Sequence, residues 1–197
     1  ESPDRAQSYL MKSLLLTGVL FVPMLLAGCS STPLGPYGYT DNYLERLDNA
    51  AGSAVLPDDA TLSRFIDFYS PLDQERIASS MDQIYAKDLY FNDTLVTLRD
   101  RNALQKHLLA TAERLSHMSL QPVNVIRDDN QIYLVWVMEA RFSLLGRERL
   151  SRTIGISQLR FNLNGQVFFH QDFWDSSQGL DQHLPLLGPM TRWLRDH

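Results

Sequence analysis

The stretch LRFNLNGQVFFHQDFWD, residues 159–175, decides the fold of this chain. Two segments with alternating side chains flank Asn164-Gly165, a dipeptide typical of the tight turn between two antiparallel strands. Alternation continues upstream, so the sequence predicts a meander of four strands, over 118–127, 131–145, 147–161 and 165–175.

Helices are predicted ahead of these strands. Asp58 or Asp59 can cap a helix with apolar residues at helical spacing, and Pro71 ends it. Two further segments with apolar residues on one stripe predict helices over 74–84 and 102–115.

The order of these elements indicates the fold class. The helices enclose a turn over 85–88 and a short strand over 89–91, and long strands follow them. Such an order is typical of α+β domains. We therefore expect a curved antiparallel sheet wrapped over three N-terminal helices, in one domain over 58–180. Residues 181–197 are expected to be a C-terminal tail.

Three segments carry a resemblance to a known family: YAKDLYFND (85–93), LRFNLNGQV (159–167) and HQDFWD (170–175). Their order and spacing resemble the nuclear transport factor 2-like superfamily, and within it the SnoaL-like and ketosteroid-isomerase-like branches. The resemblance covers 59–180. It implies a cone-shaped sheet, a cystatin-like α+β barrel, closed by helices over a single pocket.

The resemblance points to two catalytic candidates. Asp93 corresponds to the general-base aspartate of the ketosteroid isomerases, and a carboxylate at the mouth of an apolar cone suits that role. Alternatively, Asp93 is a turn residue that accepts hydrogen bonds from backbone amides. Tyr69 precedes Tyr85 by 16 residues and resembles the tyrosine that donates to a developing enolate oxygen. Alternatively, Tyr69 is an aromatic core residue.

The final strand supplies further candidates. His170, Asp172 and Trp174 share one face, because side chains alternate along a strand, and the resemblance implies that this face lines the pocket. His170 and Asp172 form either a proton relay or a purely structural polar pair. Ser157 stands where the isomerases carry a protonated acid. Since a serine is the weaker donor, this departure argues against steroid isomerisation.

The neighbouring strand is expected to form a pocket wall. Trp136, Met138 and Phe142 alternate with polar residues and, with Ser157 and Trp174, would bind a small apolar molecule. No cofactor is expected, and no metal, because the metal-binding patterns Cys-x-x-Cys and His-Glu-x-x-His do not occur. Three functions stay open: a ligand-binding domain, an isomerase- or cyclase-like enzyme, and an envelope scaffold.

The residues MKSLLLTGVLFVPMLLAGCSS, 11–31, resemble the signal of a bacterial lipoprotein. Lys12 precedes an apolar run that ends in Leu-Ala-Gly-Cys. The resemblance implies lipidation of Cys29 and a membrane anchor at the periplasmic face of the outer membrane. Residues 1–28 are then upstream residues plus signal peptide, and 29–57 a flexible tether. The alternative is an uncleaved transmembrane helix.

The composition of the chain excludes some classes of binding partner. The formal net charge is −5 and the sequence has no basic block, which argues against nucleic acid. The one cysteine excludes an internal disulfide. An apolar outer face of the sheet predicts a homodimer through this face, or a cover formed by the tail. The residues expected there are Ile154, Ile156, Val167, Phe169 and Phe173.

Overall fold

The computed structural model of the chain describes residues 37–49 and 53–197, which all fall within one compact unit, Ser31–His197. The expected signal peptide (1–28), its lipidation site Cys29 and residues 30–36 and 50–52 of the expected tether lie outside the described residues. Within the described ranges, no helix is both long and apolar enough to cross a membrane.

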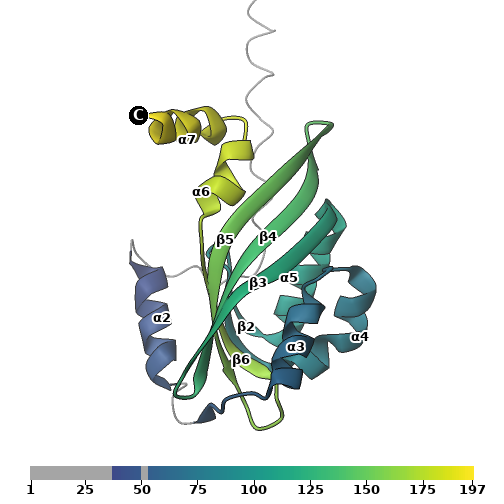
Figure 1. Ribbon diagram of the computed structural model, residues 1–197, viewed down its shortest axis with the longest axis vertical. Coiled ribbons are helices and arrows are strands. Elements are labelled where there is room, and N and C mark those ends of the chain that lie inside the picture. Colours follow the sequence, from purple (N-terminus) through teal and green to yellow (C-terminus); the bar gives the residue numbers. More distant parts are fainter. Residues whose placement is uncertain (1–36, 50–52) are drawn as a thin grey trace, which may run out of the picture. The chain divides into compact units, whose positions relative to one another are not determined.

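Four longer helices precede or separate the first strands (Figure 1): α2 (Gly38–Asn49), α3 (Asp59–Phe68), α4 (Gln74–Ile84) and α5 (Arg101–Arg114). Three of them begin after an aspartate whose carboxylate accepts a hydrogen bond from a backbone amide three residues later. The three caps are Asp58, Asp73 and Asp100. Because such caps satisfy amides that lack a partner in the first helical turn, they fix where each helix begins.

Six strands form one sheet in the order β2-β1-β6-β5-β4-β3. They are β1 (Tyr85–Asn92), β2 (Thr97–Asp100), β3 (Leu115–Asp128), β4 (Gln131–Leu144), β5 (Arg147–Phe161) and β6 (Val167–Trp174). The four predicted strands are confirmed. The expected turn over 85–88 is wrong, because these residues begin β1, and β2 was not predicted. All neighbours are antiparallel except β1 and β6, which run parallel.

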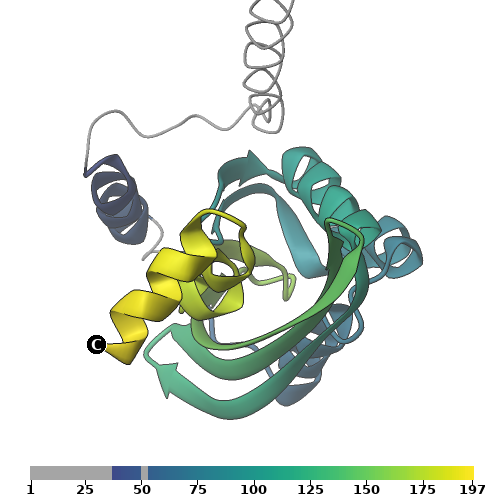
Figure 2. The same ribbon diagram turned by 90° about the horizontal axis from the view of Figure 1, so that it is seen from above.

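The sheet bends around its inner face, as Figure 2 shows. Helix α5 contacts β1 and β2 near one edge of the sheet and β3 at the other, so it spans the opening that the bend leaves. Side chains of α3, α4 and α5 join those of the inner face in a single apolar core. Examples are Phe65, Ile77, Leu104, Leu134 and Leu159. The expected α+β class, a curved sheet over three helices, is confirmed.

Helix α2 lies on the outer face (Figure 1). Its Tyr43 hydroxyl donates to Gln158 Oε1 at 2.8 Å, and its Tyr43 ring lies 6.2 Å from the ring of Phe169. Arg160 donates to the Leu47 carbonyl at 2.7 Å. This packing buries part of the face that the sequence analysis expected a second copy or the C-terminal tail to cover.

A bulge in the β5–β6 pairing corrects one expected position. The register shifts between Arg160 and Phe161, so Phe169 faces outward whereas Val167 is buried in the core beneath the sheet. The prediction that Val167 lies on the outer face is therefore wrong. Ile154 and Phe173 do lie there, and they remain 54% and 46% exposed.

The C-terminal tail forms short helices that were not predicted: α6 (Ser176–Gly179), the 3-10 helix η2 (Asp181–His183) and α7 (Leu187–Asp196). The Ser151 hydroxyl holds α6 against β5 by donating to the Gly179 carbonyl at 2.6 Å. Arg195 donates to both carboxylate oxygens of Asp175 and so ties α7 to the end of β6.

Strand β3 lies at one edge of the sheet and pairs with β4 alone. Its pairing register shifts between Pro122 and Asn124, and Pro122 has no amide hydrogen to donate. The middle of this long edge strand is therefore irregular.

Candidate functional site

A cavity of about 520 Å³ lies between the inner face of the sheet and helices α3 and α5. Its wall also includes Leu180 and Leu184 of the tail. All nine residues that the sequence analysis placed in a pocket line this cavity: Tyr69, Asp93, Trp136, Met138, Phe142, Ser157, His170, Asp172 and Trp174. The sequence therefore located the cavity, whereas the roles assigned to these residues remain predictions.

The two tryptophans of the wall fit because glycines lie behind them. A Cβ atom at Gly155 would lie 2.3 Å from the Trp136 ring, and one at Gly179 would lie 2.4 Å from the Trp174 ring. Real side chains do not approach so closely, so a larger residue at either position would displace the ring that lies against it. Gly155 and Gly179 thus help to set the volume of the cavity.

Asp93 follows β1, and both of its carboxylate oxygens are engaged. Oδ1 accepts hydrogen bonds from the backbone amides of Leu95 at 3.0 Å and Val96 at 2.8 Å, which is a turn-capping arrangement. Oδ2 lies 2.8 Å from His107 Nε2. The Asp93 carbonyl accepts from Trp174 Nε1 at 2.8 Å, which closes the end of β6 over this loop.

His107 is a cavity residue that the sequence analysis missed. It lies on α5, 14 residues after Asp93, and its side chain is about one quarter exposed. The sole local signal is its place between the buried Leu104 and Leu108. That pattern predicts a helix face near the core, but not a carboxylate partner supplied by a loop.

A continuous chain of hydrogen bonds joins six side chains along the cavity wall. The Tyr69 and Tyr85 hydroxyls are 2.5 Å apart, and Tyr85 Oη lies 2.7 Å from His170 Nδ1. His170 Nε2 lies 2.8 Å from Asp172 Oδ1, which also accepts from the Ser157 hydroxyl at 2.5 Å. At the far end, Trp136 Nε1 donates to Ser157 Oγ at 2.8 Å.

The partners fix the direction of each proton in this chain. Because Asp172 only accepts, a neutral His170 carries its proton on Nε2 and accepts at Nδ1 from Tyr85. Tyr85 therefore accepts from Tyr69, whose proton points along the chain rather than into the cavity. Burial raises the pKa of both phenols well above the usual value, so they stay protonated.

Three donors on the cavity wall are engaged within the protein. Trp136 donates to Ser157, Trp174 to the Asp93 carbonyl, and Ser151 to the Gly179 carbonyl. By contrast, Asp172 Oδ2 has no hydrogen-bond partner among the described residues, and 16% of the Asp172 side chain is exposed. Asp172 Oδ2 is therefore free to accept a hydrogen bond from a ligand, and it can also take up a proton.

No model of a protein family matches the sequence, and no curated protein matches it either. Solved structures do. A protein assigned as a SnoaL-like polyketide cyclase from Shewanella putrefaciens aligns with a TM-score of 0.54 and 12% identity, over 72% of this chain and 99% of that one. Its counterpart from Shewanella denitrificans aligns with a TM-score of 0.53 and 12% identity, over 70% of this chain and 96% of that one.

A protein with a ketosteroid isomerase-like fold from Catenulispora acidiphila, solved in complex with trimethylamine, aligns with a TM-score of 0.52 and 10% identity. That alignment covers 63% of this chain and 92% of the other. At such identities the similarity concerns the fold. The chain thus has the fold of the SnoaL-like, nuclear transport factor 2-like and ketosteroid isomerase-like proteins, as the resemblance in sequence implied.

Proposed function

We propose that this domain binds a small, mainly apolar molecule that carries a hydrogen-bond donor. The observation that carries the proposal is an apolar cavity of about 520 Å³ with one free carboxylate oxygen, Asp172 Oδ2. Cavities of roughly 300–1,000 Å³ with apolar walls and few polar groups are typical of small-molecule sites. A hydroxyl or amine of the ligand would donate to Asp172, because this oxygen only accepts.

Two probes of similar shape test this preference. N-phenyl-1-naphthylamine has one N–H donor, and in 1-phenoxynaphthalene an ether oxygen replaces it. We expect the amine to bind about tenfold more tightly, measured by equilibrium dialysis against the full chain, because a hydrogen bond to a charged group contributes about 1.5 kcal/mol or more. Asp172→Asn replaces the acceptor with an amide donor and should remove or reverse the preference. Equal binding of both probes by the unaltered protein would contradict the proposal.

A second pair of variants tests whether the cavity is the site. Ala140 lines the cavity and is buried, so Ala140→Phe should fill part of it and abolish binding of the amine probe. The matched control is Ala78→Phe, the same change at an exposed position of α4. Each variant is checked for its melting temperature. If a folded Ala140→Phe protein binds normally, the probe binds elsewhere.

The second candidate is an isomerase- or cyclase-like enzyme that moves a proton next to a carbonyl. The sequence resemblance nominates Asp93 as the general base, with Tyr69 as donor and His170–Asp172 as a relay. The contacts favour Asp172 as the base, because both oxygens of Asp93 already have partners. Asp172 has a free oxygen and is held by His170 and Ser157.

Hydrogen–deuterium exchange distinguishes an enzyme from a binding domain without knowledge of the substrate. The ketone 2-tetralone is incubated with the protein in heavy water, and its α-protons are followed by NMR. An enzyme accelerates exchange over buffer, and Asp172→Asn abolishes this while Asp93→Asn retains it if Asp172 is the base. The reverse pattern would assign the base to Asp93. Exchange at the buffer rate would give no support to the enzyme, and ligand binding would remain the proposed function.

The resemblance of residues 11–31 to a lipoprotein signal supports a proposal about where the domain acts. We propose that a lipid on Cys29 anchors the domain at the periplasmic face of the outer membrane, where apolar ligands are abundant. Radiolabelled palmitate should be incorporated into the full chain expressed in a Gram-negative bacterium, and Cys29→Ser should abolish labelling. A scaffold function, the remaining alternative, predicts a stable protein complex after detergent extraction, and it requires no ligand in the cavity.

A further inference from the structure

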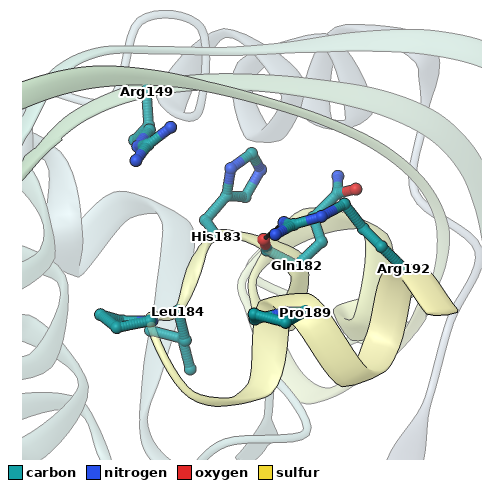
Figure 3. A pocket seen from close by; sticks show the side chains of 7 residues that line it. Arg149, Gln182, His183, Leu184, Pro189 and Arg192 are labelled. Carbon is teal, nitrogen blue, oxygen red and sulfur yellow. Dashed lines mark hydrogen bonds between the residues drawn. The ribbon is translucent and has the colours of Figure 1, made fainter.

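A second pocket, of about 360 Å³, lies between β5 and the tail helices (Figure 3). Its polar wall consists of two arginines, a histidine and a glutamine, and no acidic side chain lines it. The lining residues are Arg149, Gln182, His183, Leu184, Pro185, Pro189 and Arg192. In a chain with a net charge of −5, such a local excess of cationic groups is a distinct feature.

Arg149 and Arg192 lie on either side of the His183 ring in Figure 3. Neither arginine forms an ion pair within the described part of the chain, where Arg141, by contrast, is paired with Glu148 and Arg195 with Asp175. Arg192 is held in place by donating to the Gln182 carbonyl at 2.7 Å, which leaves further guanidinium N–H groups free.

His183 has an unmet hydrogen bond. Its Nε2 atom is buried and has no partner in the described part of the chain, an arrangement that is uncommon in folded proteins. Burial lowers the pKa of His183, and the charges of Arg149 and Arg192 lower it further. Asp181, in the same 3-10 helix, is absent from the pocket wall. A bound anion would give His183 a hydrogen-bond partner and the two arginines a negative charge to pair with.

The pocket adjoins the apolar cavity. Leu184 lines both, and the Phe142 ring, which lines the cavity, packs edge-on against His183 with 5.6 Å between ring centres. The two sites are therefore neighbours, with Leu184 and Phe142 between them.

We propose that Arg149, His183 and Arg192 form a site for a phosphate-type oxyanion. The two guanidinium groups bind its oxygens, and His183 Nε2 donates to it once the ring turns this buried atom toward the pocket. The anion is either free phosphate or the head of an amphiphile whose apolar part occupies the cavity. The second case rests on the proposed ligand-binding function, whereas the anion site itself does not.

The first test uses inorganic phosphate at constant pH and ionic strength. Calorimetric titration of the full chain should show saturable binding, and the NMR signals of the His183 ring should shift in parallel. Arg149→Gln should weaken binding about tenfold, since a charged hydrogen bond is lost. The control, Arg147→Gln, makes the same change of charge two residues away on β5, outside the pocket, and should alter binding less than twofold. His183→Gln should weaken binding and remove the shifting signals.

The second test uses dodecyl phosphate below its micelle concentration. If it binds more tightly than phosphate, and Ala140→Phe weakens dodecyl phosphate alone, the anion is the head of an amphiphile in the cavity. If both bind equally, the site takes free anions. If neither binds, or Arg149→Gln and Arg147→Gln have equal effects, the proposal is overturned. Binding of N-phenyl-1-naphthylamine should not depend on Arg149, so the two proposals can fail separately.

Discussion

Tyr85 is an inner member of the chain of hydrogen bonds, because it contacts both Tyr69 and His170, and it is fully buried. Its hydroxyl accepts from Tyr69 and donates to His170. Tyr69, at the end of the chain, makes one of these contacts. Buried polar groups are costly when a partner is removed, so the position of a residue in the chain should decide how much its loss destabilises the fold.

We therefore predict that Tyr85→Phe destabilises the protein by about 2 kcal/mol more than Tyr69→Phe. The first change leaves both the Tyr69 hydroxyl and His170 Nδ1 without partners, whereas the second removes one donor and leaves a neighbour with another contact. Urea denaturation of both variants measures the difference. Equal free energies of unfolding would mean that the chain does not act as a unit.

Tyr90 provides a prediction about pH. Burial raises the pKa of its phenol to about 12, and its hydroxyl donates to Gln171 Oε1 at 2.8 Å. An unfolded tyrosine loses its proton near pH 10. Between about pH 10 and pH 12 the folded state therefore binds more protons than the unfolded state, so the free energy of unfolding falls as pH rises. Denaturation of Tyr90→Phe should show a shallower fall across this window, and parallel curves would contradict the assignment.

The limits of sequence analysis are clear for single residues. Tyr69, Asp172 and Trp174 could be placed at one cavity because strand alternation and family resemblance both depend on local spacing. His107 and His183 could not. The contacts that distinguish them come from a loop and from strand β5, and nothing near either histidine in sequence encodes those partners.

Among the structural elements, the loop between β1 and β2 depends on Asp93. Asp93→Ala should destabilise the protein by about 1–2 kcal/mol, because two backbone amides lose their acceptor. Asp93→Asn retains an oxygen in the Oδ1 position and should cost less than half as much. Thermal or urea denaturation checks both. A similar loss in the two variants would show that the negative charge, rather than the turn contacts, stabilises the loop.

Elements with strong periodicity were predicted well and short ones were not. The helix over 74–84 matches α4 at both ends, and the Asp73 cap fixes where it begins. The strand over 147–161 matches β5 at both ends, and the turn at Asn164-Gly165 follows it. Strand β2 has four residues, too few for a pattern to emerge. Helices α6 and η2 have four and three residues and are likewise too short to show a pattern. Helix α7 has apolar residues at helical spacing, but these side chains are exposed and Pro185 and Pro189 lie at its start, so the sequence did not indicate where it would pack.

For the whole molecule, the open question is what covers the outer face of the sheet. Helix α2 covers Phe169, while Ile154 and Phe173 remain about half exposed. We predict a homodimer through these residues. Sedimentation of the full chain in detergent should give twice the chain mass, and Ile154→Glu should weaken association at least tenfold by placing a charge at the interface.

The control for this prediction is Val123→Glu, at an exposed position of β3. It should leave the dimer intact. A monomer at all concentrations would contradict the prediction, and so would a dimer that tolerates Ile154→Glu. The overall bend of the sheet could be predicted from family resemblance. The cover formed by α2 could not, because its partners Gln158, Arg160 and Phe169 lie far away in the sequence.

The irregular edge strand β3 has a consequence for how copies of this protein can meet. A flat, regular edge would invite another strand to extend the sheet, and eventually a fibre. Pro122 and the register shift beside it interrupt the row of groups that such an extension needs. At a high local concentration of the protein, this interruption would protect it from runaway polymerisation.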